Sequence, residues 1–166
     1  MSFAWGDSAE VVKHRTRYLK KWGVGIKDCV FAELAHDDRI VIVAKKDCGT
    51  KVRAEALMTR ERHVGLFFST ADCLPIAYHD VVHDAIAFAH LGWKPTSLGL
   101  SAKVVKSMEK EFGSRPEDIR VHIGPSIRKD SYRVKDPAQV SDPRWTPFLE
   151  RGEDGLTSID LVGFNI

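Results

Sequence analysis

The stretch that decides the fold is Ser69-Thr-Ala-Asp-Cys-Leu-Pro-Ile-Ala-Tyr-His79, followed by Ala87-Phe-Ala-His-Leu-Gly-Trp93. Both parts carry apolar runs of strand length, so two strands joined by a turn are predicted. Such a pair of strands brings Cys73 and His90 together, although they lie 90 − 73 = 17 residues apart. A thiol beside an imidazole serves as a nucleophile with its base, or as two ligands of a soft metal ion. The simpler alternative is that both side chains fill a core, because free cysteine is among the most buried residue types.

The composition indicates an ordinary soluble protein. With 166 residues, 43% of them apolar and 29% charged, the chain is long enough for one domain with its own core. A formal net charge of +2 without long like-charge blocks excludes dedicated nucleic-acid or membrane-surface binding. No apolar run approaches the ~20 residues that span a bilayer, and no signal-peptide pattern opens the chain. The three cysteines (Cys29, Cys48 and Cys73) lack a disulfide-framework spacing, which predicts a cytoplasmic protein.

Two helices are predicted far apart in the chain. The first covers residues 7–22, with Asp7 and Glu10 as a capping box and Gly23 as its stop. Its expected apolar face is Val11, Val12, Tyr18, Leu19 and Trp22. The second covers residues 97–112, with an apolar stripe of Val104, Val105, Met108 and Phe112.

Short apolar and β-branched runs between and after these helices predict strands. The expected strands cover residues 29–34, 39–44, 64–68, 74–78, 85–89 and 119–123. Residues 45–53 are expected to form a polar loop, and Trp145 and Phe148 are expected to anchor the Pro- and Asp-rich residues 135–155. Because strands outnumber helices, mixed sheets covered by helices are predicted.

Three chemistry-bearing side chains lie at predicted strand ends. Cys73 precedes Leu74-Pro75, and a proline there favours a strand edge or bulge, where active-site side chains are often re-aimed. His90 leads into a Gly-Trp exit, and His36 follows an apolar run. Three protein ligands with an open fourth position are the usual arrangement of catalytic zinc. The sequence therefore offers His36, Cys73 and His90 as a zinc site, with isolated polar side chains as the alternative.

Two basic residues complete the candidate site. Lys94 lies four residues beyond His90, and Arg15 lies on the first predicted helix. If both face one cleft, they supply positive charge for phosphate or another anion. Surface solvation is the alternative for both.

Three motifs occur in an order and spacing typical of a known family. They are Thr70-Ala-Asp-Cys-Leu-Pro75, Ala89-His-Leu-Gly-Trp93 and Ile123-Gly-Pro-Ser-Ile127, the last followed by Tyr132 and Val134. Together they closely resemble the laccase-domain family, also called multicopper polyphenol oxidoreductase or polyphenol-oxidase-type purine nucleoside phosphorylase. The resemblance covers most of the chain from about Ala9 onward, and residues 55–59 resemble the acidic stretch that leads to the first motif.

The resemblance implies an α+β fold, layered α/β/β/α with mixed sheets, like the catalytic domain of cytotoxic necrotizing factor toxins. It implies a zinc ion held by His36, Cys73 and His90, with Cys73 and His90 catalytic. It also implies a nucleoside and phosphate as partners. The implied reaction is phosphate-dependent cleavage of adenosine, inosine, guanosine and methylthioadenosine, with adenosine deamination as a companion activity.

The chain departs from the family pattern at several places. His36 lies in Leu34-Ala-His-Asp37, without the family's glutamine and glycine. Lys94 replaces the usual arginine, which keeps the charge but loses the bidentate fork. The resemblance would continue past Asn165, so residues 1–166 are expected to be a single laccase-like domain of a truncated or divergent member. These departures favour, as one alternative, a degenerate binding module without catalysis.

Two enzymatic alternatives also stay open. A metal-free cysteine hydrolase would use Cys73 as nucleophile and His90 as base, with Asp72 or a backbone carbonyl orienting the imidazole. It competes with the metal site for one sulfur, because a zinc-bound thiolate is a poor free nucleophile. A multicopper oxidase typically needs His-x-His pairs, and none occurs among the seven histidines. Copper is therefore expected only as an alternative to zinc at a single site.

Overall fold

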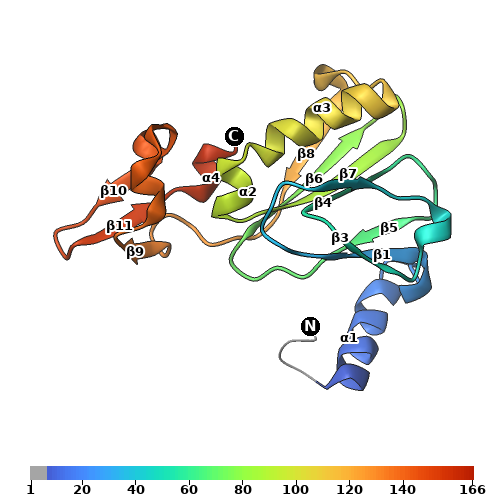
Figure 1. The fold of residues 1–166 in the computed structure, drawn as a ribbon. Coiled ribbons are helices and arrows are strands. Elements are labelled where there is room, and N and C mark those ends of the chain that lie inside the picture. The colour runs from blue at the N-terminus through green and yellow to red at the C-terminus, as the bar shows by residue number, and fades with distance from the viewer. Residues whose placement is uncertain (1–6) are drawn as a thin grey trace.

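Residues 7–166 are described by a computed structural model, in which the chain forms three β-sheets (Figure 1). The largest sheet has five strands in the order β2-β4-β7-β6-β8. These strands are β2 (Ile40–Ile42), β4 (Ala56–Thr59), β6 (Leu74–Asp80), β7 (Ala85–Leu91) and β8 (Ile119–Ile123). β2 runs parallel to β4 and the other pairs are antiparallel, so the sheet is mixed, as predicted.

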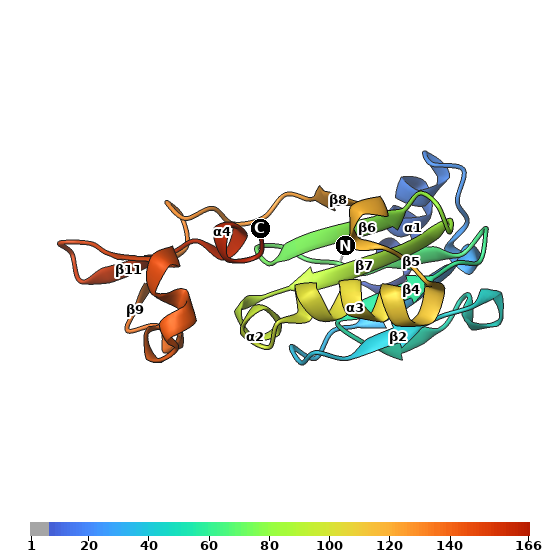
Figure 2. The ribbon, with the colours of Figure 1, turned by 90° about the horizontal axis from the view of Figure 1, so that it is seen from above.

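A second sheet stacks on the first, and a third projects from the body. The second has the order β3-β1-β5 and is parallel throughout, with β1 (Cys29–Glu33) between β3 (Lys51–Arg53) and β5 (Gly65–Phe67). The third is antiparallel, with β11 (Leu156–Ile159) between β10 (Leu149–Arg151) and β9 (Arg133–Lys135). Figures 1 and 2 show this third sheet extending beyond one end of the two stacked sheets.

Helices cover the outer faces of the two stacked sheets. α3 (Leu100–Phe112) lies along the five-stranded sheet and buries Leu100, Val104, Met108 and Phe112, one residue per turn (Figure 2). α1 (Ser8–Lys20) packs on the opposite side, where Leu19 meets Cys29 and Phe31 of β1. The order of layers in Figure 1 is therefore helix, sheet, sheet, helix, an α+β arrangement. The closer likeness to cytotoxic necrotizing factor toxins stays a prediction.

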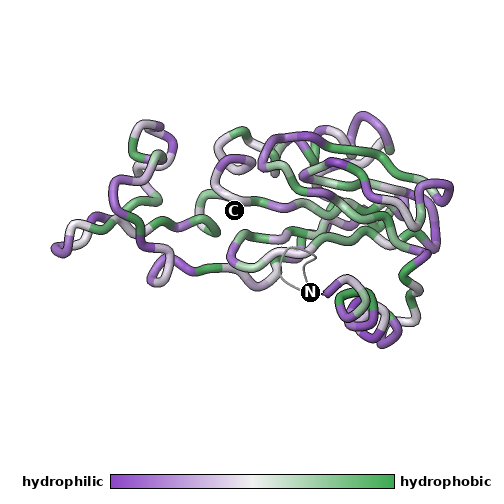
Figure 3. Tube along the Cα trace, turned by 60° about the horizontal axis from the view of Figure 1, so that its bottom comes forward, coloured by the Kyte–Doolittle hydropathy of each residue, from purple (hydrophilic) through white to green (hydrophobic). Residues whose placement is uncertain are grey.

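The remaining elements are short. α2 (Trp93–Ser97) follows β7 directly, and α4 (Leu161–Phe164) follows β11. Short 3₁₀ helices cover Ile26–Asp28, Lys45–Asp47, Pro116–Asp118, Ala138–Ser141 and Pro143–Phe148. Hydrophobic segments concentrate along the strands of the stacked sheets, and hydrophilic ones lie in many of the outer turns (Figure 3). No helix within residues 7–166 has the length and apolarity needed to cross a bilayer.

Several sequence predictions are wrong or incomplete in detail. The predicted strands omit β4, β9, β10 and β11, and the helix predicted over residues 97–112 begins only at Leu100, after α2 has ended at Ser97. Residues 45–53 are not only a polar loop, because β3 forms there as a short, mostly exposed edge strand. The first helix does not bury Val12, Tyr18 and Trp22, which are 41%, 48% and 71% exposed. Of the predicted face it buries Val11 and Leu19, and the unpredicted Arg15 lies between them, so the three buried residues follow one another at four-residue intervals.

Asp80 stabilises the turn between β6 and β7 and gives stability a pH dependence. Its carboxylate is fully buried and accepts hydrogen bonds from the N–H groups of Val82 and His83 and from Nδ1 of His83. Burial alone raises the pKa of Asp80, but these bonds and the neighbouring Ser114 outweigh it and hold the pKa far below the ordinary 3.8.

We expect Asp80→Asn to be less stable than the wild type at neutral pH, with a difference that narrows in acid. Because the folded-state pKa is depressed, the contribution of the carboxylate is fully present above pH ~4 and is lost as the pH falls toward the folded pKa. Urea unfolding of both proteins between pH 5 and pH 2 measures this difference. All other carboxylates are the same in the two proteins, so their contributions to the pH dependence cancel. A difference that does not change over this range would contradict the assignment.

Candidate metal centre

The structure brings His36, Cys73 and His90 into one group. One ligand atom from each side chain lies within 4.8 Å of the other two. Cys73 directly precedes β6, and His90 lies near the end of β7 opposite Pro75, so the antiparallel pairing of β6 and β7 sets their approach. His36 follows the end of β1, in the other stacked sheet. The site therefore forms where the two sheets meet at one end.

The three side chains differ in burial, and a glycine leaves space between them. His90 is 2% exposed, Cys73 is half-buried and His36 is exposed. The two imidazole rings are nearly perpendicular, with centroids 5.3 Å apart. A Cβ atom added at Gly92 would lie 3.1 Å from Cys73 Sγ and 3.5 Å from the His36 ring. Gly92 thus keeps open the volume that these ligands surround.

A buried carboxylate, Glu55, contacts two of the three residues. Its Oε2 lies 2.7 Å from Nδ1 of His90, and its Oε1 accepts hydrogen bonds from the backbone N–H groups of Ala35 and His36. Glu55 is fully buried, immediately before β4. The hydrolase hypothesis gave the role of orienting His90 to Asp72 or a backbone carbonyl, and this is wrong, because Glu55 holds that place. The sequence signal was a charged residue directly before the apolar run of residues 56–58.

His36 has an unusual backbone conformation. Its φ is +56°, in the left-handed region that non-glycine residues rarely adopt. The residue after it in the family motif is glycine, whereas here it is Asp37. The bond from the His36 N–H to Glu55 helps to hold this conformation. The backbone therefore directs the exposed imidazole toward Cys73 and His90.

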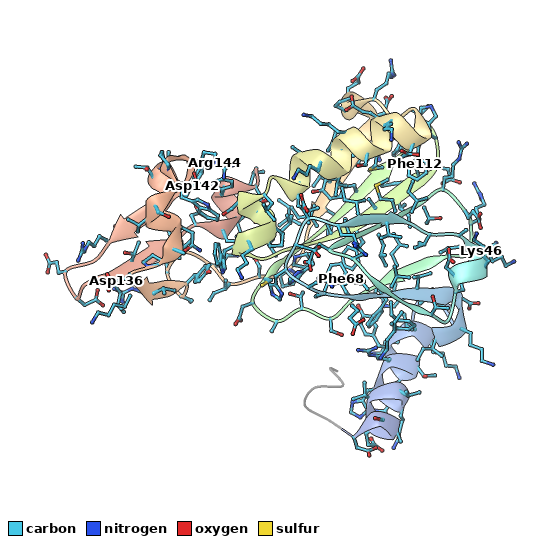
Figure 4. The ribbon with its side chains drawn as sticks, viewed as in Figure 1. Lys46, Phe68, Phe112, Asp136, Asp142 and Arg144 are labelled. Carbon is cyan, nitrogen blue, oxygen red and sulfur yellow. The ribbon has the colours of Figure 1, made fainter. Side chains whose placement is uncertain are left out.

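The electrostatics of the group favour a proton on His90 when no cation is bound. Burial lowers the pKa of His90, but hydrogen bonds with Cys73 and Glu55 outweigh it and raise the pKa to about 9. Burial raises the pKa of Glu55, but His90 and the two backbone N–H groups lower it overall. Glu55 is therefore a carboxylate that only accepts hydrogen bonds. Phe68, labelled in Figure 4, packs edge-on against His90 with centroids 5.8 Å apart.

A pocket of about 270 Å³ opens onto His36 and Cys73, and His90 lies behind them. Its lining residues are His36, Asp72, Cys73, Gly92, Trp93, Ile127, Tyr132 and Leu161. Trp93 and Tyr132 give it two aromatic walls. Burial raises the pKa of Tyr132, and the nearby Cys73 acts in the same direction, so the phenol keeps its proton. A larger cavity of about 550 Å³ lies beside the third sheet and has none of the triad residues in its wall.

Lys94 and Arg15 occupy different surroundings. Lys94 is exposed, with its ammonium 5.5 Å from the Trp93 ring centroid. Arg15 is buried, with its guanidinium over the rings of Phe31 and Phe67, and it donates to Ser69 Oγ at 3.4 Å. Arg15 lines a separate pocket of about 240 Å³. Lys94 thus adjoins the triad pocket through Trp93, and the convergence of both cations on one anion stays a prediction.

The donor set fits a transition-metal ion. One thiolate and two imidazoles suit zinc or copper, whereas calcium and magnesium prefer oxygen ligands. Three protein ligands would leave one coordination position for water or substrate, as in catalytic zinc centres. A buried carboxylate bonded to a ligating histidine is the usual support of such sites. The residues present therefore fit a single ion.

Comparisons with known proteins identify the family of the chain. A family model described as multi-copper polyphenol oxidoreductase laccase matches residues 1–165. Purine nucleoside phosphorylase YlmD of Bacillus subtilis (strain 168) is 34% identical over 136 residues, which are 77% of this chain and 49% of that protein. A purine nucleoside phosphorylase of Bacteroides thetaiotaomicron is 35% identical over 138 residues, 78% of this chain and 51% of that protein. The chain thus spans about half the length of these curated relatives.

A solved structure shares the fold. The crystal structure of YlmD from Geobacillus stearothermophilus superposes with a TM-score of 0.91 at 29% identity, covering 99% of this chain and 66% of that one. The layered arrangement of mixed sheets is therefore that of a solved relative.

Proposed function

This chain belongs to the multi-copper polyphenol oxidoreductase laccase family, and we propose that its site catalyses zinc-dependent phosphorolysis of purine nucleosides. The observation that carries the proposal is the His36, Cys73 and His90 group, of which His36 and Cys73 line a pocket with aromatic walls. The relatives named purine nucleoside phosphorylase support the choice of reaction. The proposed substrates are adenosine, inosine, guanosine and methylthioadenosine, with adenosine deamination as a companion reaction, in the cytoplasm.

The three ligands would hold zinc through defined atoms. His90 offers Nε2, because its Nδ1 faces Glu55, and Cys73 offers its thiolate. Bound zinc would supply Lewis-acid chemistry at a substrate oxygen or lower the pKa of a water. Phe68 packs against the buried ring of His90, and together these two side chains keep bulk water from the inner side of the site.

The pocket residues would orient the nucleoside and the phosphate. Trp93 and Tyr132 offer aromatic surface to the purine, and the protonated phenol of Tyr132 can donate a hydrogen bond to a ring nitrogen. Lys94, and Arg15 if it reaches the same anion, would bind phosphate. In the reaction a phosphate oxygen forms a bond to C1′ as the bond from C1′ to the purine nitrogen breaks. The purine takes up a proton, and the products are the free base and the sugar 1-phosphate, which is ribose 1-phosphate except from methylthioadenosine, whose sugar keeps its methylthio group.

Laccase chemistry is not proposed, despite the family's description. Within residues 7–166, one group of three His, Cys, Asp or Glu side chains is close enough to hold an ion, and it has room for a single site. A multicopper oxidase requires a cluster of copper ions with many histidine ligands. Copper could replace zinc at this one site, because copper(II) binds most such donor sets more tightly.

A metal-free cysteine hydrolase is the second candidate, and one observation favours it. Cys73, His90 and Glu55 follow one another through hydrogen bonds in the order nucleophile, base and orienting carboxylate. Metal content distinguishes the candidates. Stoichiometric zinc that is lost in Cys73→Ser supports phosphorolysis, whereas metal-free protein whose Cys73 is rapidly alkylated supports the hydrolase.

Incubation of zinc-loaded protein with inosine and phosphate is expected to release hypoxanthine, and Cys73→Ser is expected to reduce the rate to background. Chromatography of the bases measures both, and omission of phosphate is the matched control. Adenosine incubated with and without phosphate separates cleavage to adenine from deamination to inosine. Folded, zinc-loaded protein that binds nucleosides without converting any of them would overturn the proposal in favour of a non-catalytic binding module.

A further inference from the structure

Glu55 links two parts of the site that are distant in sequence. One carboxylate oxygen holds the N–H groups of Ala35 and His36, and the other contacts the His90 ring. Glu55 and His90 are 35 residues apart, and the pairing of β4 with β7, which sets Ala56 opposite Ala89, brings them together. Both side chains are nearly or fully buried, so water does not compete for these bonds.

The arrangement fixes which nitrogen of His90 keeps its proton when the ring is neutral, as it is in a metal ligand. A carboxylate accepts hydrogen bonds and cannot donate them, so Nδ1 of His90 must be the N–H donor to Glu55. In the neutral imidazole the other nitrogen, Nε2, is then left with its lone pair toward Cys73 and the pocket. A lone pair at that atom is what a metal ligand requires.

We propose that Glu55 is a positioning residue that sets the tautomer of His90 and the backbone of His36, so that both imidazoles are ready to bind a transition-metal ion. The inference rests on the proposed metal site and goes beyond its three ligands. One buried carboxylate thereby couples the two histidines, although they come from different sheets.

Glu55→Gln tests the tautomer with little change of shape. The amide oxygen must face the N–H groups of Ala35 and His36, because the amide nitrogen cannot accept their hydrogen bonds. The amide NH₂ then faces Nδ1 of His90, which has to become an acceptor. The ring proton moves to Nε2, where it blocks metal coordination. We expect zinc affinity, measured by competition with a chromophoric chelator, to fall about 10- to 100-fold.

Asp80→Asn is the matched control for loss of a buried carboxylate. Like Glu55, Asp80 is fully buried and accepts hydrogen bonds from two backbone N–H groups and from one histidine Nδ1, at 2.8 Å. Its histidine partner is His83, and it lies at the end of β6 far from the metal centre. We expect it to lower the unfolding midpoint while zinc affinity stays within about twofold of the wild type. An equal loss of zinc affinity in both variants would show that destabilisation is the cause, and would overturn the positioning role.

A measurement on the wild-type protein keeps the inference testable if Glu55→Gln does not fold. In zinc-loaded protein labelled with ¹⁵N-histidine, NMR should show the proton of His90 on Nδ1 and zinc on Nε2. Zinc on Nδ1, or wild-type zinc affinity in folded Glu55→Gln, would overturn the role of Glu55 and leave the metal site intact. A wild-type protein that binds no zinc would instead overturn the proposed site on which the inference depends.

Discussion

Replacing Gly92 with valine is expected to lower zinc affinity and kcat/KM for nucleoside cleavage by at least about 100-fold. The backbone of Gly92, with φ −77° and ψ 177°, suits any residue, so the substitution acts through its side chain. Its Cβ alone would lie 3.1 Å from Cys73 Sγ, and the two added methyl groups would fill the space among the ligands. Cys73, His36 and a bound ion cannot all keep their positions beside this side chain.

A graded series isolates the steric cause. Gly92→Ala adds the Cβ alone, which a shift of Cys73 by a few tenths of an ångström can accommodate, so its loss of affinity should be smaller. Zinc titration and steady-state kinetics are measured on both variants well below their unfolding midpoints, because overpacking costs about 1–3 kcal/mol of stability. Zinc affinity equal to the wild type in Gly92→Val would show that the ion does not bind between these ligands.

Trp145→Ala is expected to destabilise the protein by about 3–5 kcal/mol. The indole is fully buried, stacks on Phe164 with ring centroids 4.1 Å apart, and donates from Nε1 to Ser97 Oγ at 2.9 Å. It thus joins the turn before β10 both to α4 and to the end of α2. Beside it, Arg144 donates to the Ser97 carbonyl and contacts Asp142 (Figure 4). The truncation should lower the thermal midpoint by about 6–20 °C.

Trp22→Ala is the control for removal of an indole. Trp22 is 71% exposed, so we expect a change within about 0.5 kcal/mol. Calorimetry or thermal circular dichroism of the two variants compares them directly. Similar midpoints for both would contradict the role of Trp145 as the anchor of the C-terminal segment.

Four of the five strands in the five-stranded sheet could be predicted because their patterns are local, whereas β4, a run of four buried residues, was missed. β6 and β7 alternate buried and half-buried residues along most of their length, and their antiparallel pairing follows from a short turn. The proximity of Cys73 and His90 could be predicted from this pairing alone. The buried indole of Trp145 confirms the anchor predicted from an isolated tryptophan in a polar segment.

The errors in the predicted secondary structure arise where contacts with residues distant in sequence determine the local structure. On α1, helical spacing permits more than one face, and the rings of Phe31 and Phe67 stabilise the guanidinium of Arg15 in the buried position. β3 is short and polar, and it is a strand only because β1 pairs with it. Both choices depend on residues from another part of the chain.

The site was predicted in part for the same reason. His36 was selected by its place after an apolar run, and it lies in the segment that joins β1 of one sheet to β2 of the other, where it meets the other two candidate ligands. Glu55 was missed as the partner of His90, because no spacing rule relates residues whose strands pair across the sheet. Its charge beside a buried run was the signal available.

At position 36 the requirements of folding stability and of metal binding are opposed, because His36 has a left-handed backbone conformation. For a side chain with a Cβ, such a conformation costs about 1–2 kcal/mol, and glycine would relieve it. Glycine would also remove one of the three candidate ligands. Selection for thermal tolerance alone would therefore drive position 36 away from histidine, whereas selection for the bound ion would retain it. A stability-guided redesign of this protein should leave that residue unchanged.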